Sequence, residues 1–302
     1  MTTAGMSPSH WRASGHTFDW HGHRIFWREA GSGEPLLLLH GFPTSSWDWR
    51  HVWDELARQY RVLALDYLGY GFSDKPASGP YSVLTYADQA EALIARSSVG
   101  PRIHLLAHDL GDTVAQELMA RDRERGPTHG SAALASVAML NGGIFPEMHR
   151  PRITQKLLDS PIGFAVARLT DRKKLGKGLS AVFGPRTQPS EAELDGFWEC
   201  ASAANGLRNY HLLIRYMRER RRHRDRWVGP ILEGTIPFAL INGHLDPVSG
   251  KHVIGRLREL RPGAEVHDLP DIGHYPQTEA PADVLRAYAA FRAGVTRLRA
   301  AH

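Results

Sequence analysis

Four short segments of the chain carry residues suited to nucleophilic and acid–base chemistry. They are HGFP at 40–43, AHDLG at 107–111, GHLDPV at 243–248 and GHYPQTEAP at 273–281. Each follows an apolar run of the kind that forms a buried strand. Ligands bind at the carboxyl ends of strands in open α/β sheets, so these segments are expected to meet at one site. The candidate catalytic residues there are Asp109, Asp246 and His274.

Asp109 lies where a strand is predicted to turn sharply into a helix. The segment Ala107–Gly111 matches the nucleophile elbow, with Asp in place of the usual Ser and Ala in place of the first Gly. An alternative interpretation is a helix N-cap, because Asp is favoured at that position. In the elbow architecture the nucleophile, the acid and the histidine follow one another along the chain. Asp109, Asp246 and His274 have this order, which favours a catalytic triad over a cap.

The triad gives each residue a role. Asp109 would attack, because a carboxylate with an unperturbed pKa near ~4 is already ionised at neutral pH. It suits a saturated carbon with a leaving group, since attack on an ester would give a reactive anhydride and esterase or peptidase action is therefore disfavoured. His274 would then activate water, while Asp246 orients the imidazole. Asp268 and Asp271 are the alternatives as the orienting acid.

The elements around these segments alternate between strand and helix. Apolar runs predict strands at 23–31, 34–42, 61–71, 102–109, 133–143, 235–247 and 264–274. Helical spacing predicts helices at 46–60, 81–100, 112–124 and 282–300. Such a series is typical of an α/β fold with a mostly parallel sheet and helices on both faces.

One long segment interrupts this alternation. From Ile144 to about Gly234 the chain is rich in Pro, Gly, Arg and helix formers and has no long apolar strand. The strand pattern resumes afterwards, so the segment divides a single sheet. We expect a core formed by residues 1–143 and 235–302, with a helical cap at 144–234 inserted between the two parts.

Composition limits the location of the protein and its cofactors. Cys200 is the only cysteine, which excludes an internal disulfide framework and fits a reducing cytoplasm. The apolar stretches are strand-sized, so neither secretion nor stable membrane insertion is expected. The pairs His21 with His23 and His104 with His108 lack the helical HExxH context of a metal site. No metal or other cofactor is expected.

The formal net charge of +5 is partly local. Seven arginines lie between Arg215 and Arg226, but Glu219 and Asp225 are interspersed and no stacking-aromatic module accompanies them. We expect a solvated helix face here and no nucleic-acid site.

Taken together, the four segments resemble the α/β-hydrolase family, in the branch of epoxide hydrolases and haloalkane dehalogenases. The likeness runs from about residue 20 to residue 298. Within that branch the chain resembles the mesoderm-specific transcript proteins, through HGFPTSSWDW, LGYGFSDKP, HDLGDTVAQEL, NGGIFPEMHRP and RWVG. The resemblance implies the α/β-hydrolase fold and an oxyanion hole made by the backbone N–H groups of Phe42 and Leu110. Pro43 is expected to fix the Phe42 loop.

The resemblance also separates two reactions. Dehalogenases of this fold hold halide with an indole N–H after the nucleophile and often an Asn after the HG pair, and fluoroacetate-type enzymes place arginines just after the nucleophile. In this chain the residue after the nucleophile is Leu110 and the residue after the HG pair is Phe42, so neither the indole nor the Asn is present. The arginines after the nucleophile are also absent. Epoxide hydrolases use two lid tyrosines, and Tyr216 is similar to the second. An aromatic residue that packs the lid onto the core is the alternative role for Tyr216.

The first lid tyrosine has no clear counterpart. Residues 144–209 contain no Tyr, and Tyr210, six positions before Tyr216, would lie about 240° around a helix from it. His149 and Trp198 are the candidates to replace it.

These inferences predict an enzyme that opens epoxides to vicinal diols through an alkyl-enzyme ester on Asp109. Its partners would be a small apolar substrate and water, and it would be a monomer or a homodimer. A haloalkane dehalogenase is the enzymatic alternative. A binding or scaffold protein of hydrolase fold with little turnover is the alternative from another class.

Overall fold

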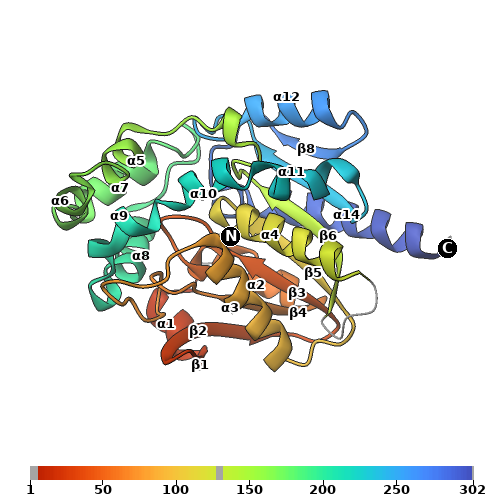
Figure 1. Cartoon of the computed structure of the whole chain (residues 1–302), viewed down its shortest axis with the longest axis horizontal. Helices are drawn as coiled ribbons and strands as arrows, with labels where there is room; N and C mark the ends of the chain where they lie inside the picture. The colour runs from red at the N-terminus through yellow and green to blue at the C-terminus, as the bar shows by residue number, and fades with distance from the viewer. Residues whose placement is uncertain (1–5, 127–131, 301–302) are drawn as a thin grey trace.

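The structure is a computed structural model that describes residues 6–126 and 132–300. An eight-stranded sheet lies at its centre, with strand order β1-β2-β4-β3-β5-β6-β7-β8 (Figure 1). The strands are β1 (His16–Trp20), β2 (His23–Ala30), β3 (Glu34–Leu39), β4 (Tyr60–Leu65), β5 (Arg102–His108), β6 (Ala133–Leu140), β7 (Phe238–Gly243) and β8 (Glu265–Leu269). Strands β1 and β2 are antiparallel to their neighbours, and all the other pairs are parallel. The predicted, mostly parallel α/β sheet is confirmed.

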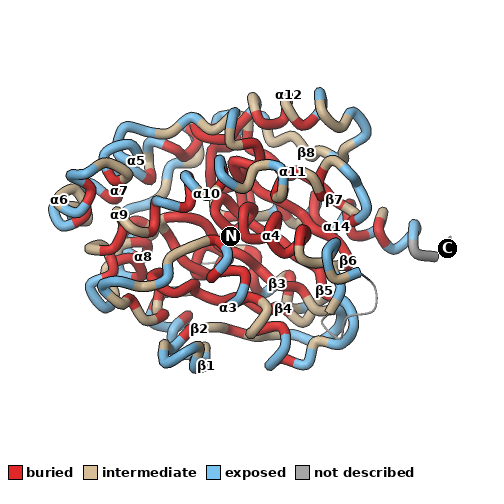
Figure 2. The backbone as a smooth tube through the Cα atoms, viewed as in Figure 1, coloured by how far each residue is buried: buried red, intermediate tan, exposed pale blue. Residues whose placement is uncertain are grey.

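The central strands are apolar at nearly every position, as expected for strands in a sheet that helices flank. Leu36, Leu37, Leu38 and Leu39 of β3 are completely buried, and the tube in Figure 2 shows the buried residues concentrated in the sheet. Helices α3 (Val83–Arg96), α4 (Leu110–Arg125) and α11 (Arg224–Glu233) pack side by side, while α14 (Pro281–Ala300) packs against β7 and β8. Helix α12 (Lys251–Leu260) connects these last two strands. A continuous run of leucines is the expected pattern for a strand that helices cover on both faces of the sheet.

Two regions near the N-terminus differ from the predicted elements. The helix predicted over 46–60 is instead a 3₁₀ helix, η1 (Ser46–His51), followed by a short helix, α2 (Trp53–Ala57). A short helix α1 (Pro8–Ala13), which the sequence had not indicated, begins with Ser7 as its N-cap. Its Trp11 is fully buried and donates a hydrogen bond from Nε1 to Ser46 Oγ at 3.0 Å. This contact fixes the N-terminal segment to the loop that follows β3.

The segment between β6 and β7 is helical, as predicted. It contains η2 (Pro146–Met148), α5 (Ile153–Leu158), α6 (Gly163–Arg168), α7 (Arg172–Ser180), α8 (Glu191–Ser202), η3 (Ala203–Asn209), α9 (Tyr210–Leu213), α10 (Tyr216–Arg222) and α11. Helices α5 and α6 lie far from the sheet at the left of Figure 1, whereas α11 packs on α4. Cys200 on α8 is buried, and burial raises the pKa of its thiol. No helix in the described ranges is long and apolar enough to cross a bilayer.

Candidate active site

Asp109 occupies a strained turn between β5 and α4. Its backbone has φ 50° and ψ −108°, a conformation that costs a non-glycine residue about 1–3 kcal/mol. The turn is tight because small residues surround it. A Cβ on Gly111 would lie 2.2 Å from the carbonyl oxygen of Leu39, and one on Gly41 would lie 2.8 Å from the Cβ of Asp109. The sharp strand-to-helix turn expected from the sequence is present.

The carboxylate of Asp109 does not cap the helix. The residue stands at the N-cap position of α4, but its side chain makes no capping hydrogen bond. Instead, the backbone N–H of Phe42 donates to its Oδ2 at 2.9 Å. The Leu110 backbone N–H is a further hydrogen-bond donor to this carboxyl, although burial raises its pKa overall. The two backbone groups expected to form an oxyanion hole therefore both act on Asp109.

His274 lies between two buried carboxylates. Its Nδ1 is 2.8 Å from Asp246 Oδ2, and its Nε2 is 3.7 Å from Asp109 Oδ1. Asp246 follows β7 and His274 follows β8, so neighbouring strand ends bring these side chains together. An Nδ1–H donated to Asp246 leaves Nε2 facing the nucleophile position. The three residues have the arrangement of a catalytic triad.

Three donors hold Asp246 in place. The Asn141 Nδ2 and the Ser249 Oγ donate to its Oδ2 at 3.0 and 2.7 Å, and the Val248 backbone N–H donates to its Oδ1 at 2.7 Å. Burial raises the pKa of Asp246, but the charge and hydrogen bond of His274 and the neutral donors outweigh it and bring the pKa to about 2. The acid is therefore fixed and ionised at neutral pH.

The alternative orienting acids lie elsewhere. Asp268 accepts hydrogen bonds from His244 at 2.7 Å and from Arg258 at 2.6 Å. Asp271 forms an ion pair with Arg186 at 2.6 Å. Both are engaged with other partners, and the structure places neither against the triad histidine.

The charges of the triad are coupled. Burial lowers the pKa of His274, but Asp246 and Asp109 outweigh it and raise the pKa to about 9. Burial raises the pKa of Asp109, while His274, the Phe42 N–H and Arg220 act in the opposite direction. In the resting protein at neutral pH, His274 is therefore an imidazolium beside ionised Asp246.

Helix α10 places two polar side chains above Asp109. Tyr216 is 2% exposed, its ring centroid is 6.1 Å from that of Phe42, and its hydroxyl interacts with the Asp109 carboxylate. Burial and the Asp109 carboxylate raise the pKa of this hydroxyl. Arg220, one turn later, is 3% exposed, and its Nε and Nη2 lack hydrogen-bond partners in the described chain. Burial lowers the pKa of Arg220, and the nearby Tyr216 and Asp109 act against this change.

The buried position of Arg220 corrects the expected solvated face. The other arginines of the run do lie nearer to solvent, and several form ion pairs: Arg218 with Asp159, Arg224 with Glu147, and Arg226 with Glu117 and Glu124. Arg220 differs because it lies four residues after Tyr216, on the same face of the helix. The four-residue spacing from Tyr216, which was already a candidate site residue, was the signal in the sequence that could have placed Arg220 at the site.

Asp112 is a second buried acid that sequence reasoning missed. It lies one turn after Asp109 in α4 and is completely buried. Burial and the neighbouring Asp109 raise its pKa well above the usual range. The helical spacing of three residues from Asp109 was the signal in the sequence. The neutral acid is the form that this environment favours.

Tyr210 lies closer to Tyr216 than the sequence argument allowed. The two residues belong to separate helices, α9 and α10, so the argument from one continuous helix was wrong. The Tyr210 ring centroid is 5.5 Å from that of Phe42, and its hydroxyl donates to the Pro43 carbonyl oxygen at 2.9 Å. Both tyrosine rings therefore pack against Phe42, but the Tyr210 hydroxyl is already engaged.

The two candidates for the missing lid donor differ in position. His149 is half-buried, and its Nδ1 lies 3.4 Å from Arg220 Nη1. Burial, with the Arg220 charge, lowers the pKa of His149 to about 3, so this side chain is neutral. Trp198 is half-buried on α8, and neither it nor His149 is among the residues that line the cavity described below. The structure brings His149, and not Trp198, to the Arg220 side of the site.

A cavity of about 910 Å³ leads to the triad. Phe42, Tyr210 and His274 line it, together with residues of α5, α6 and α7 and of the loops beside them, and with Pro247 and Val248 after β7. Most of these side chains are apolar, which suits an apolar ligand.

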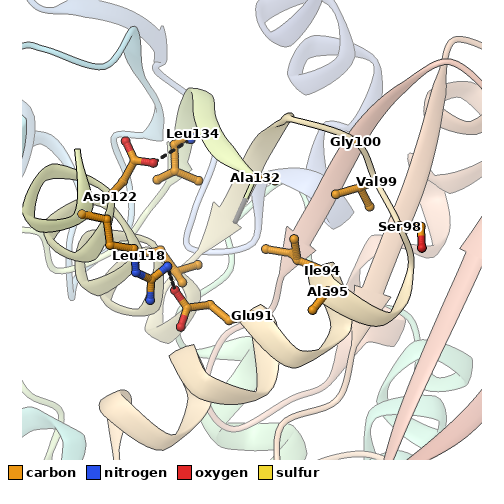
Figure 3. A pocket seen from close by; sticks show the side chains of 11 residues that line it. Glu91, Ile94, Ala95, Ser98, Val99, Gly100, Leu118, Asp122, Ala132 and Leu134 are labelled. Carbon is orange, nitrogen blue, oxygen red and sulfur yellow. Dashed lines mark hydrogen bonds and ion pairs between the residues drawn. The ribbon is translucent and has the colours of Figure 1, made fainter. Parts of the chain in front are cut away.

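A smaller cavity, of about 290 Å³, lies away from the triad (Figure 3). It includes Gly100, just before β5, and Ala132, just before β6, at the opposite edge of the sheet. Asp122 and Leu134 are joined there by a backbone-to-carboxylate hydrogen bond of 3.0 Å. The cavity holds none of the candidate site residues.

Comparisons with known proteins identify the family of the chain and agree with its fold. Residues 36–287 match the alpha/beta hydrolase family. The chain is 43% identical over 294 residues to the mesoderm-specific transcript homolog protein of Homo sapiens, covering 93% of this chain and 86% of that protein. A haloalkane dehalogenase loop variant from Bradyrhizobium elkanii has a TM-score of 0.78 at 23% identity, over 95% of this chain and 98% of that one. The epoxide hydrolase CorEH has a TM-score of 0.74 at 22% identity, over 93% and 99%. These two structural likenesses concern the fold.

Proposed function

The chain belongs to the alpha/beta hydrolase family, and from this premise we propose that it opens epoxides to vicinal diols through an ester on Asp109. One observation carries the proposal: a buried aspartate occupies the strained turn, and His274, the Tyr216 hydroxyl and Arg220 all interact with its carboxylate. An aspartate needs no base for a first attack on a saturated carbon. The arrangement supplies a nucleophile, a base and donors for a leaving oxygen.

The first step forms the ester. An Asp109 oxygen attacks an epoxide carbon, and the ring C–O bond breaks with its electron pair moving to the ring oxygen. Tyr216 donates its proton to that oxygen, and the Arg220 charge stabilises the tyrosinate and the developing alkoxide. Donors aimed at developing charge in a buried site are worth about 10²–10³ in rate each. Solvent then returns a proton to Tyr216.

The second step hydrolyses the ester. Alkylation removes the negative charge of Asp109, one of the charges that raise the pKa of His274, so this pKa falls and the imidazolium loses its proton more readily. Neutral His274 then takes a proton from water, which attacks the ester carbonyl carbon. The Phe42 and Leu110 N–H groups hold the oxyanion. Its collapse expels the alkoxide, which takes a proton from the His274 imidazolium and leaves as the diol. The acid left on Asp109 then returns its proton to His274 and becomes the carboxylate again.

Haloalkane dehalogenation is the second candidate. It is favoured by Arg220, whose unpartnered N–H groups are able to hold a halide as well as an alkoxide. It is disfavoured by Leu110 and Phe42, which offer no side-chain donor for the halide. We place it second because the Tyr216 hydroxyl supplies the proton that an opening epoxide needs and a departing halide does not.

Trapping the ester tests both reactions. His274→Ala protein is incubated with a panel of epoxides and haloalkanes, and its peptides are analysed by mass spectrometry. An epoxide should add its whole mass to the peptide with Asp109, whereas a haloalkane should add its alkyl group and release halide. His244→Ala is the control, because His244 binds Asp268 and not a candidate site residue. This variant should turn over substrate normally and should not accumulate the adduct. Adducts at another residue, or turnover that survives Asp109→Ala, would show that the proposed nucleophile is wrong.

A further inference from the structure

The outer helices of the inserted segment expose an unusual group of apolar side chains. Five of them lie between residues 153 and 169 and are between 39% and 76% exposed: Ile153, Leu157, Ile162, Phe164 and Leu169. They belong to α5, α6 and the loops beside them, which project from the left side of the molecule (Figures 1 and 2). We call these five residues the apolar patch. Elsewhere in the described chain, the large apolar side chains of comparable exposure are scattered singly at Leu84, Leu245 and Leu298.

Positive charge surrounds the apolar patch. The sequence from 150 to 181 contains eight basic residues and two acidic ones, an excess larger than the +5 of the whole chain. Lys156, Arg168, Lys173 and Lys177 are exposed and form no ion pair within the described chain. By contrast, several arginines near the core are paired with carboxylates. The charge around the patch is therefore available to an external partner.

The patch also contains the mouth of the active-site cavity. Ile153 and Leu169 are both exposed and both line the cavity that reaches Phe42 and His274. Lys177, from the basic group, lines it as well. A surface seated on the patch would therefore meet the entrance to the candidate active site.

We infer that the apolar patch and its basic surround dock on the surface of an anionic lipid bilayer. Apolar side chains that enter the interface, together with Lys and Arg that attract anionic headgroups, are the two components of such binding. Helices α5 and α6 have six residues each, so they lie in the interface and do not span it. A second copy of this chain fits less well, because a two-fold interface would set the same positive surface against itself.

Docking gives the cavity a direct supply of substrate. An apolar epoxide dissolved in the bilayer would enter the cavity between α5 and α7 without crossing water. This consequence rests on the proposed function, whereas docking itself does not. The expected substrate class is then a membrane-soluble epoxide with a long alkyl or isoprenoid chain, which a cavity of about 910 Å³ can hold.

Vesicle flotation tests the docking. The full chain is mixed with phosphatidylcholine vesicles that contain or lack phosphatidylglycerol, at low and at high NaCl. Binding should require the anionic lipid and should weaken with salt, because salt screens exposed charges. The triple variant Ile162→Ser, Phe164→Ser, Leu169→Ser should bind at least about tenfold more weakly, since each large apolar side chain contributes to partitioning. The control pair Leu84→Ser and Leu298→Ser removes apolar side chains that are 37% and 59% exposed elsewhere, and it should bind as the wild type does.

A second pair of variants tests the charges. Replacing Lys156, Lys173 and Lys177 by Gln should weaken binding by up to about fivefold per residue. The matched change of Lys251 and Arg297, exposed cations away from the patch, should have little effect. Folding of every variant is checked by its thermal transition.

Three outcomes overturn the docking inference. They are an absence of binding to anionic vesicles at low salt, equal binding by the patch and control variants, and a dimer of the wild type that only the patch variants dissociate. The last would assign the patch to a second copy of the chain. Flotation measures no turnover, so its result is independent of whether an ester forms on Asp109.

Discussion

The sheet and the helices above it contribute to the candidate site in different ways. On the sheet side, Asp246 accepts hydrogen bonds from three neighbouring donors and holds His274 at 2.8 Å. On the helix side, Arg220 is buried, but its Nε and Nη2 lack hydrogen-bond partners in the described chain. Buried polar groups usually have partners, so the difference is informative. Asp246 and His274 are held in place without substrate, whereas Arg220 presents donors that a leaving anion would satisfy.

The largest effect is expected from a substitution on the sheet side of the site. Asp109→Ala removes the nucleophile, and turnover of any accepted epoxide should fall by about 10⁴-fold or more, as it does when a catalytic group of a triad is lost. Asn141→Ala is the milder companion, because it removes one donor to Asp246 and leaves two. Steady-state kinetics with purified variants measure both. If Asp109→Ala retained more than a small fraction of wild-type turnover, the sheet side would not supply the nucleophile.

Arg220→Met tests the helix side with a side chain of similar length and no charge. Formation of the ester should slow by about 10²–10³-fold, because a buried donor to the developing anion is lost. Ester hydrolysis should change little, and single-turnover quench experiments separate the two steps. Arg222→Met, an exposed arginine two residues later, is the matched control and should behave as the wild type. Equal slowing of both steps would assign Arg220 to folding.

Tyr216→Phe should have a smaller effect on the same step. The ring against Phe42 is kept and only the proton donor is removed, so epoxide opening should slow by about 10²-fold, within the usual range for general acids. A haloalkane, which needs no proton, should react at the wild-type rate. Tyr210→Phe is the control, because its hydroxyl already donates to Pro43. Equal slowing with both substrates would contradict the role of Tyr216 as a proton donor.

The pH dependence should separate the two steps. His274 has a pKa of about 9 because Asp246 and Asp109 outweigh the effect of burial, and the ester lacks the Asp109 charge. Hydrolysis of the ester should therefore rise with pH through a midpoint below about 9 and then level off. Asp246→Asn removes a further negative charge, so its midpoint should lie still lower, with a reduced plateau. Rapid-quench measurements of ester decay test this, and a midpoint above that of the free protein would contradict the coupling.

The smallest expected effect compares the stability of the two regions. Gly178 in α7 and Gly255 in α12 are exposed helical glycines, and a Cβ would meet nothing within 4 Å at either position. Alanine should stabilise each helix by about 0.5–1 kcal/mol. We propose that residues 144–234 form a cap that unfolds separately from the core. In that case Gly255→Ala should raise the main thermal transition and Gly178→Ala an earlier one, whereas equal shifts of a single transition would show one cooperative unit.

The sheet side was predictable because its signals are local. An apolar run followed by a catalytic residue type fixes that residue to a strand end, and parallel strand ends share one edge of the sheet. Asp109, Asp246 and His274 are brought together in this way although 165 residues separate the first from the last. Even the turn at Asp109 could be predicted, because small residues in fixed positions accompany it.

The helix side was less predictable because its contacts depend on how short helices are joined. The sequence from Tyr210 to Tyr216 contains no Gly or Pro that would end a helix. The structure nevertheless has two separate helices there, and the rings of both tyrosines lie against Phe42. Arg220 has the same residue type as its exposed neighbours, and only packing against the core distinguishes it. The predicted helix at 46–60 was incorrect for a related reason, since a tight 3₁₀ turn begins at Ser46, where tertiary hydrogen bonds to Trp11 and Asp66 fix the chain.

The single buried thiol of this chain makes the mouth of the cavity open to site-specific labelling. Cys200 is buried, and its raised pKa keeps it as the unreactive thiol. A cysteine introduced at an exposed position such as Thr154 on α5 would therefore react with a maleimide dye while the native one stays protected. A fluorophore placed there would report polarity at the mouth of the cavity as substrate or vesicles are added. The label needs no cysteine-free background, so the protein that is observed differs from the natural one at a single residue.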